Sequence, residues 1–169
     1  MTFGRGIPVT GMLVLGLILG NSIAAAPSTG AEQGVVSFQN LLGWWSGTGR
    51  LGSKDGKRGA VKYRATYRWD DAGGKLLQAV RCASASGKVD IKSEIQEAGC
   101  QLKGTWRERT YEFEGDVLGE TIEGGFRVSF SGTDIKANMT VFVKGKRRIV
   151  EVQFLDNELI GLSIIFEKG

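Results

Sequence analysis

Histidine is absent from this 169-residue chain, and that absence decides which chemistry is available to it. It removes Ser-His-Asp and Cys-His catalysis, the commonest general base, histidine-ligated haem and most zinc sites. The one acidic cluster comprises Glu108, Glu112, Glu114 and Asp116. On a strand, these carboxylates are better explained as a solvated face that forms ion pairs than as a glycosidase pair or a calcium site. We therefore expect no enzyme activity, no cofactor and no metal site.

Aromatic side chains are the residues best suited to binding. If the strands alternate as their sequences indicate, the inward side chains share one interior. A barrel of nine or ten strands can enclose more space than its side chains fill, which would leave room for a ligand. Tyrosine hydroxyls or a serine would orient a small apolar or amphipathic, lipid-like molecule there. The candidate ligand-binding residues are Tyr63, Tyr67, Ser93, Trp106 and Met139.

A basic segment, Lys144–Arg148, is predicted to form the tip of a hairpin. The full chain has 22 basic and 18 acidic residues, a formal net charge of +4. Such a surface suits an ordinary charged turn, or contact with phosphate or with an anionic membrane surface. Nucleic-acid binding is disfavoured, because the charge is modest and the protein is expected to be exported.

Export is predicted from the first 26 residues. Arg5 precedes an apolar stretch at 9–18, and Ala24, Ala25 and Ala26 follow, which is the pattern of a cleavable signal peptide. The apolar stretch is about 11 residues, short of the roughly 20 that a membrane-spanning helix needs. We expect a signal peptide at 1–26, a flexible mature N-terminus at 27–34 and a single barrel domain at 35–169, in the periplasm or secreted.

The two cysteines, Cys82 and Cys100, form an even pair, which invites a disulfide in an exported protein. Hairpin turns at 84–88 and 97–99 would place Cys82 opposite residue 90 and Cys100 opposite residue 96. The two would then lie about six residues, or roughly 20 Å, apart along the sheet. A disulfide needs Cα atoms within about 7 Å, so the register disfavours the bridge.

These candidate residues depend on strands that the hydrophobic period predicts. Residues 61–69 alternate between an apolar and a cationic face, and the same period of two recurs along the chain between glycine-containing turns. Regular spacing of this kind indicates a barrel or a sandwich, and the absence of long helical stretches excludes parallel βαβ units. We expect an all-β fold, an antiparallel up-and-down barrel of about nine or ten strands with one short N-terminal helix. After an entry at Gly43, the expected strands are 61–69, 75–84, 88–96, 100–108, 109–117, 126–130, 135–143, 148–155 and 159–167.

The last predicted strand, 159–167, is apolar on both faces, so its outer side needs a cover. The segment 35–42 has an apolar stripe of its own, with Ser37 as the N-cap of a short helix and Gly43 as its stop. We expect that helix to cover the outer face of the last strand.

The segment Gly43-Trp44-Trp45-Ser46-Gly47-Thr48-Gly49 resembles the G-x-W entry of lipocalins and the G-x-W-x-G-x-G entry of nitrobindin-like barrels. The resemblance implies a calycin-type antiparallel barrel that holds an apolar ligand, with Trp45 as the plug of one barrel end. Nitrobindin-like barrels bind haem through a histidine, which this chain lacks. Lipocalins pair their tryptophan with a basic residue just after the last strand, and Lys168 is the only candidate at that place.

Together these features predict an exported, lipocalin-like barrel that binds a small apolar or amphipathic ligand non-covalently. The alternative is an envelope-associated structural or interaction module with a filled core and no small-molecule ligand. Interior space distinguishes the two, since a carrier needs a cavity and a module does not.

Overall fold

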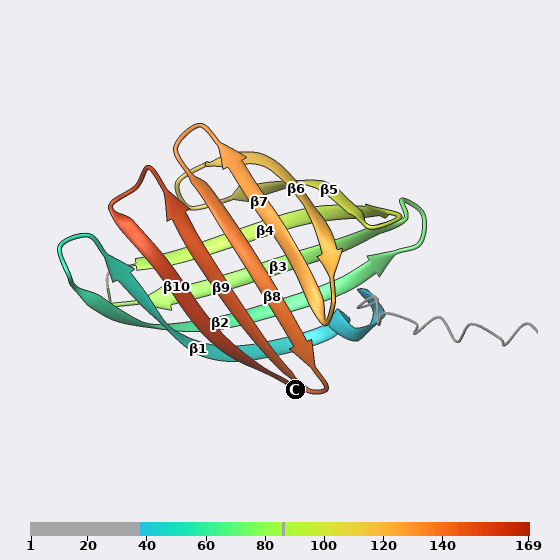
Figure 1. The fold of residues 1–169 in the computed structure, drawn as a ribbon, viewed down its shortest axis with the longest axis horizontal. Helices are drawn as coiled ribbons and strands as arrows, with labels where there is room; N and C mark the ends of the chain where they lie inside the picture. Colours follow the sequence, from blue (N-terminus) through green and yellow to red (C-terminus); the bar gives the residue numbers. More distant parts are fainter. Residues whose placement is uncertain (1–37, 86) are drawn as a thin grey trace, which may run out of the picture. The chain divides into compact units, whose positions relative to one another are not determined.

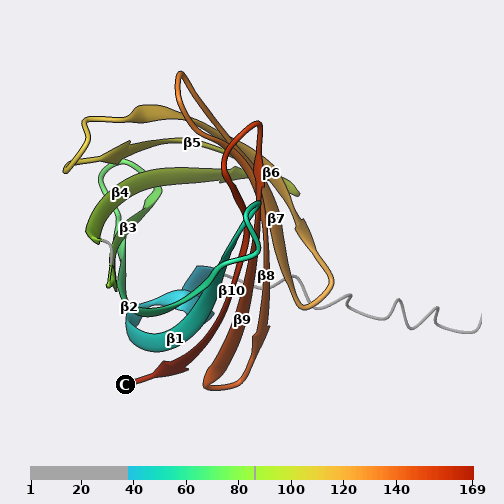
Figure 2. The same ribbon diagram turned by 90° about the vertical axis from the view of Figure 1, so that its left-hand side faces the viewer.

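The computed structural model describes residues 38–85 and 87–169, and these form a closed barrel of ten antiparallel strands. Each strand pairs with its neighbour in sequence, and β1 pairs with β10 to close the barrel (Figures 1 and 2). The elements are η1 (Phe38–Leu41), β1 (Gly43–Ser53), β2 (Arg58–Asp70), β3 (Lys75–Ser84), β4 (Gly87–Ala98), β5 (Gln101–Glu108), β6 (Glu114–Ile122), β7 (Gly125–Gly132), β8 (Lys136–Lys144), β9 (Arg147–Leu155) and β10 (Leu159–Lys168). The predicted all-β up-and-down barrel is confirmed. The predicted signal peptide and mature N-terminus lie outside the described residues.

The strand pairing fixes which side chains face the interior, because residues opposite each other in an antiparallel pair lie on the same face. Tyr67 pairs with Gln78, Gln78 with Ser93, and Ser93 with Trp106, which forms one inward row across four strands. The next inward row is Ala65, Val80, Ile91 and Glu108, and the row after it begins with Tyr63, Cys82 and Val89. Alternate residues such as Lys62 and Arg64 are exposed on the outside, as the alternating pattern predicts.

The expected N-terminal helix is a single 3₁₀ turn of four residues, Phe38–Leu41. The amide of Leu42 donates a hydrogen bond to the carbonyl of Gln39, three residues back. The indole Nε1 of Trp45 donates a hydrogen bond to the carbonyl of Leu41 at 2.7 Å. Gly43 then adopts a φ of 107°, which turns the chain directly into β1. Residues 35–37 of the predicted segment lie outside the described part of the chain.

The expectation that this segment covers the outer face of the last strand is wrong. Phe38 and Leu41 instead pack into the core at one end of the barrel. Ile160 and Ile165 remain 54% and 47% exposed on β10. The 3₁₀ turn lies at the barrel end and not on the outer wall, because a hydrogen bond from Trp45 to Leu41 holds it there.

The strand predicted at 109–117 begins later, at Glu114. The amides of Thr110 and Tyr111 donate to the Glu108 carboxylate at 2.9 Å and 2.6 Å, so they cannot join a strand ladder. Glu112 adopts a positive φ of 59°, which also breaks the extended chain. Residues 109–113 therefore form a loop between β5 and β6.

No helix in the described ranges combines the length and the hydropathy needed to cross a bilayer.

Candidate functional site

The barrel interior has a closed end and an open end. The closed end contains η1 and the turns β2–β3, β4–β5, β6–β7 and β8–β9. Its inward side chains are almost completely buried and fill the space between the strands. They include Trp45, Tyr67, Leu76, Ile95, Leu102, Phe126, Arg148 and Phe166.

Arg148 is the charged residue of this closed end. Its guanidinium carbon lies 4.4 Å from the ring centroid of Trp45, 4.5 Å from that of Tyr67 and 4.8 Å from that of Phe166. The side chain is 1% exposed, and its three guanidinium nitrogens have no hydrogen-bond partner in the described part of the chain. Aromatic faces are therefore the surroundings that stabilise this cation.

Lys168 is not the only basic partner of the entry tryptophan, contrary to expectation. Its Nζ lies 5.6 Å from the Trp45 ring centroid, farther than the Arg148 guanidinium carbon. Arg148 is the second residue of β9 and faces inward. Sequence reasoning placed it in a basic hairpin tip and missed this position, although Arg148 alternates in phase with the inward Val150 and Val152. Trp45 itself is completely buried at the closed end, in the place expected of a barrel-end plug.

The open end of the interior lies toward the turns β1–β2, β3–β4, β5–β6, β7–β8 and β9–β10. Many inward side chains here are apolar yet only partly buried. They come from strands on opposite sides of the barrel, so water reaches them from inside the ring. They include Val80, Cys82, Val89, Ile91, Met139, Val152 and Leu162.

A hydrogen-bonded row of polar side chains separates the two ends. Ser93 Oγ donates to Gln78 Oε1 at 2.8 Å, and Gln78 Nε2 donates to the Tyr67 hydroxyl oxygen at 3.0 Å. The Trp106 ring lies in the same row, and its Nε1 is buried without a hydrogen-bond partner among the described residues. Sequence reasoning missed Gln78, whose inward position could have been found from its place in the alternation of β3.

Tyr63 and Cys82 lie opposite each other on β2 and β3, closer to the open end. Burial raises the pKa of Tyr63 well above its usual value, and a hydrogen bond to the Cys82 thiol adds to the shift. Burial also raises the pKa of Cys82, although the hydrogen bond from Tyr63 partly opposes it. Both groups are therefore neutral at physiological pH, which suits an amphipathic ligand better than a charged one.

All five candidate ligand-binding residues face the interior. Tyr67, Ser93 and Trp106 lie in the polar row, Tyr63 faces inward two rows nearer the open end, and Met139 faces inward from β8. Cys82 faces the interior as well, whereas Cys100 is exposed in the turn between β4 and β5. Both cysteines are free, which agrees with the register that disfavoured a disulfide.

Glu108 is a buried acid that the sequence assigned to a solvated face. It is 2% exposed, and its carboxylate accepts hydrogen bonds from the amides of Asp90, Thr110 and Tyr111. Burial alone would raise the pKa of Glu108, but these backbone hydrogen bonds outweigh it and lower the pKa. Glu108 thus holds the β5–β6 loop at the open end, while Glu114 pairs outside with Arg107 at 2.8 Å.

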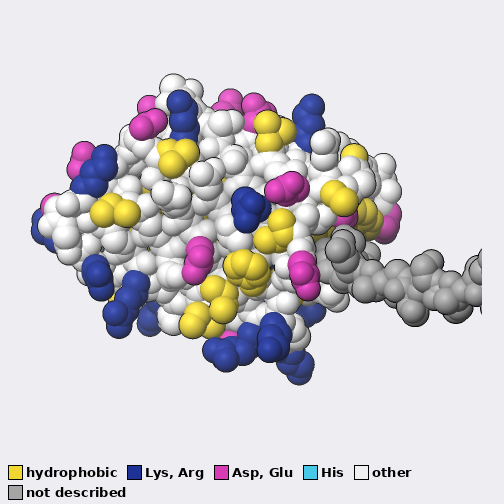
Figure 3. All heavy atoms as spheres, viewed as in Figure 1, with side chains coloured by type: hydrophobic (Ala, Val, Ile, Leu, Met, Phe, Trp, Pro, Cys, Tyr) yellow, Lys and Arg dark blue, Asp and Glu magenta, His cyan; other side chains and the backbone are white. Residues whose placement is uncertain are grey.

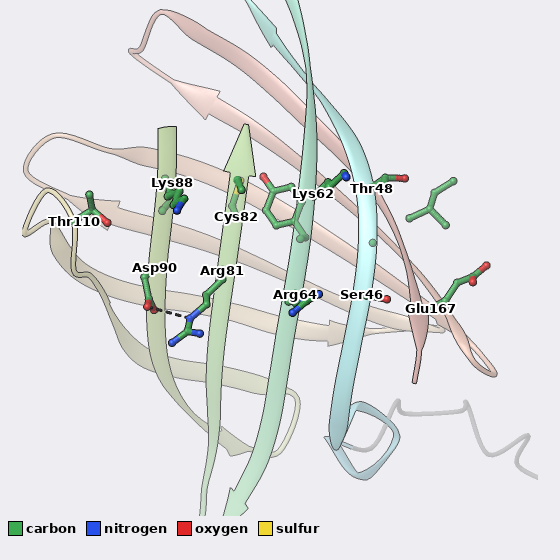
Figure 4. Close-up of a pocket in the computed structure, with 15 residues that line it drawn as sticks. Ser46, Thr48, Lys62, Arg64, Arg81, Cys82, Lys88, Asp90, Thr110 and Glu167 are labelled. Atoms are coloured by element: carbon green, nitrogen blue, oxygen red, sulfur yellow. Dashed lines mark hydrogen bonds and ion pairs between the residues drawn. The ribbon is translucent and has the colours of Figure 1, made fainter. Parts of the chain in front are cut away.

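An open pocket of about 1000 Å³ is lined by residues of β1–β4 and β10 and by Thr110 of the β5–β6 loop (Figure 4). Its basic lining residues include Lys62, Arg64 and Lys88, which alternate with inward residues and face outward. Arg81 and Asp90 are joined by an ion pair at 3.3 Å. The lining also includes Tyr63, Cys82 and Val89, which face the interior, so the pocket shares side chains with the open end.

In the described ranges, no three histidine, cysteine or acidic side chains come close enough together to hold a metal ion.

No protein-family model matches the chain, and no curated protein matches it in sequence. Solved structures match its fold. The crystal structure of Rv2717c from M. tuberculosis has a TM-score of 0.64 at 9% identity, over 78% of this chain and 96% of that one. A protein of the DUF3598 family from Nostoc punctiforme has a TM-score of 0.60 at 15% identity, over 79% of this chain and 49% of that one, so this chain spans about half its length.

The third similar structure is the S-type phycobiliprotein lyase CpeS from Guillardia theta. Its TM-score is 0.53 at 9% identity, over 78% of this chain and 90% of that one. At such low identities the likeness concerns the fold alone. The chain thus shares its antiparallel barrel fold with a phycobiliprotein lyase and with two further proteins.

Proposed function

We propose that this protein is exported and binds a small amphipathic molecule non-covalently in the open end of its barrel, in the manner of a lipocalin. The observation that carries the proposal is the partly exposed set of inward apolar side chains, such as Val80, Ile91 and Val152. Packed interiors leave few voids larger than a water molecule, so apolar side chains that water reaches from inside a barrel line usable space. This observation favours a ligand carrier over a module with a filled core.

The polar row gives the proposed ligand its orientation. An apolar part of the ligand would pack against the open-end side chains, which removes apolar surface from water. A polar part would meet neutral hydroxyl, amide or thiol groups, namely Tyr63, Ser93, Gln78 and Cys82. We therefore expect the interior to bind an uncharged or weakly polar head group, and the proposal includes no catalytic step.

The structural neighbours support a binding role in general terms. One of them is named as a phycobiliprotein lyase, and this protein shares its barrel. The nature of the ligand is proposed here from the interior side chains alone.

The two free cysteines provide a matched test of the binding site. In a Cys100→Ser variant, a bulky maleimide attached to Cys82 would occupy the open end. In a Cys82→Ser variant, the same maleimide attached to Cys100 would lie on an external turn. Binding of a dansyl-labelled fatty alcohol, whose head group is uncharged, is measured by fluorescence before and after labelling.

We expect the Cys82 adduct to lose probe binding and the Cys100 adduct to keep it. Absence of probe binding in both unlabelled variants would overturn the proposal. Equal binding by the two adducts would also overturn it, because the probe would then bind away from Cys82.

Export has a test of its own. The full chain is expressed with a C-terminal tag, cells are fractionated, and the mass of the product is measured. We expect periplasmic or secreted protein that has lost about the first 26 residues, in accordance with the leader pattern. Full-length protein in the cytoplasmic fraction would contradict this part of the proposal and leave the binding test unaffected.

A further inference from the structure

The outer face of β8, β9 and β10 carries three exposed apolar side chains in adjacent positions. Ile165 pairs with Ile149, and Ile149 pairs with Phe142, so the three lie side by side across the strands. Their exposed fractions are 47%, 45% and 44%. Figure 3 shows apolar side chains gathered on this face of the molecule. We call Phe142, Ile149 and Ile165 the apolar row.

Basic residues border the apolar row on the side of the β8–β9 turn. Lys144 pairs with Arg147 in the next outward row, and Lys146 lies at the tip between them. All three are exposed, and Figure 3 shows basic side chains at this lower edge. Glu167 is the acid in that row, since it pairs with Arg147. On this side of the apolar row the three cations outnumber the one acid, while Glu151 lies in the outward row on its other side.

An exposed tryptophan lies at the same edge. Trp44 is 55% exposed and follows Gly43 at the start of β1. Its carbonyl accepts from the amide of Gly169, and the amide of Lys168 donates to the carbonyl of Lys146. These two backbone hydrogen bonds connect the Trp44 edge to the β8–β9 turn.

The basic character continues around the barrel from the apolar row. Ile165 pairs with Thr48, and Thr48 pairs with Lys62. In the next row Ser46 pairs with Arg64. Cations therefore border the apolar row both at the hairpin tip and across β1.

We infer that this face docks onto an anionic lipid surface. An apolar row bordered by cations is complementary to a bilayer with negative head groups, since basic residues attract the surface and apolar side chains enter the boundary below the head groups. Tryptophan also prefers that boundary, because its ring is largely apolar and its N–H is polar. A protein partner would match the apolar row but would need an acidic border of its own. The inference is independent of the interior ligand, because these side chains all face outward.

The docking test uses the full chain and vesicles of two compositions. Vesicles of phosphatidylglycerol with phosphatidylethanolamine provide the anionic surface, and phosphatidylcholine vesicles provide the neutral one. Binding is measured by flotation. We expect binding to the anionic vesicles that weakens with added salt, and little binding to the neutral vesicles.

A matched pair of variants separates local docking from net charge. Lys144→Gln, Lys146→Gln and Arg147→Gln together remove three charges at the docking edge. Lys54→Gln, Lys57→Gln and Arg58→Gln remove three exposed charges at the β1–β2 turn, at the opposite end of the barrel. Each basic residue near an anionic surface contributes about five-fold in affinity, so the first variant is expected to bind roughly 100-fold more weakly. The second variant is expected to bind like the unchanged protein.

Two further readouts address the apolar part of the face. Phe142→Ser, Ile149→Thr and Ile165→Thr together should weaken binding while the charges remain. Vesicles with brominated lipid should quench tryptophan emission. Trp44→Phe should remove most of that quenching, because Trp45 and Trp106 are 0% and 5% exposed and Trp69 packs against the core.

Several results would overturn the inference. They are absence of vesicle binding, equal loss of binding in both charge variants, and equal binding to neutral and anionic vesicles. A dimer in native mass spectrometry that the apolar-row variant abolishes, without vesicle binding, would assign the face to a second copy of the chain and would also overturn it.

Discussion

The guanidinium of Arg148 stacks on the indole of Trp45, with 4.4 Å between the guanidinium carbon and the ring centroid. The tryptophan is the third residue of β1 and the arginine is the second residue of β9, so one contact joins strands that are far apart in the sequence. Tyr67 and Phe166 complete the aromatic surroundings of the cation. The contact lies at the closed end, among the side chains that fill the interior there.

Arg148→Met should keep stability within about 1 kcal/mol of the original protein, whereas Arg148→Ala should lose about 2–4 kcal/mol. Methionine retains the volume and avoids the desolvation of a buried charge, which offsets the lost cation–π contacts. Alanine loses the packing and leaves a cavity among three aromatic rings. Urea unfolding followed by tryptophan fluorescence measures both variants.

If Arg148→Met proves as unstable as Arg148→Ala, the positive charge itself stabilises the closed end, and packing is not the main contribution. A Lys168→Met variant is the control, since Lys168 lies farther from the same ring and should change stability little.

Glu108→Gln should destabilise the protein by about 1–3 kcal/mol at neutral pH, because an ionised acceptor of backbone N–H groups is replaced by a weaker, neutral one. Burial opposes ionisation of Glu108, but hydrogen bonds from Asp90, Tyr111 and Thr110 prevail and lower its pKa. A lowered folded-state pKa contributes stability that is present above the unfolded value of about 4.3 and is lost as the pH falls through the folded value.

The difference in stability between Glu108→Gln and the unchanged protein should therefore shrink as the pH falls below about 4.3. Urea midpoints between pH 3 and pH 7 test this. A difference that stays constant over that range would show that the carboxylate is not ionised in the folded protein. Glu114→Gln is the control, because Glu114 is an exposed partner of Arg107 and should change stability by less than about 1 kcal/mol.

The sequence was sufficient to predict the barrel and the orientation of its strands. Alternation along residues 61–69 correctly placed Tyr63 and Tyr67 inside and Lys62 outside, because the period of a strand is set by backbone geometry alone. Pairing of neighbouring strands followed from the short turns. The same alternation disfavoured a bridge between Cys82 and Cys100, and both are free.

The features missed by the sequence analysis depend on contacts between distant residues. Arg148 follows two basic neighbours, so nothing local indicates that it stacks under Trp45. The Glu108 carboxylate accepts hydrogen bonds from amides of the loop that follows it. These hydrogen bonds end the strand, whereas the alternating pattern would continue it through Tyr111. The contrast between the open and the closed end depends on how η1 folds under the barrel, which periodicity does not encode.

Cys100 should react with a maleimide much faster than Cys82 near neutral pH. Cys100 is exposed, whereas Cys82 is partly buried inside the barrel and burial raises its pKa. Because the thiolate is the nucleophile, a raised pKa lowers the reactive fraction at a given pH. Mass spectrometry of timed samples of the Cys82→Ser and Cys100→Ser variants measures each rate separately.

Raising the pH should accelerate labelling of Cys82, since more thiolate forms as the pH approaches its raised pKa. A ligand bound in the open end should slow Cys82 and leave Cys100 unchanged. Equal rates for the two cysteines would show that Cys82 is not enclosed by the barrel.

Gly115→Ala should destabilise the barrel by about 1–3 kcal/mol, the usual cost of forcing an extra group into a packed interior. A Cβ on Gly115 would overlap the backbone carbonyl of Ser131 on β7, and backbone cannot move aside as a flexible side chain can. Gly115 also pairs with Trp106, so a shifted β6 would disturb the ring that lies in the polar row.

Gly59→Ala is the matched control for Gly115→Ala, because a Cβ on Gly59 has no atom within 4 Å and Gly59 also lies in a strand. Alanine there restricts the unfolded chain and should leave stability unchanged or raise it by about 0.4–1 kcal/mol. Thermal unfolding and tryptophan emission are measured for both variants. A Gly115→Ala protein that is as stable as Gly59→Ala would mean that β6 and β7 can separate without cost. In that case the strands that carry the polar row can shift to admit an extra methyl group. A loss of stability in Gly115→Ala alone would show that these strands hold the polar row rigidly.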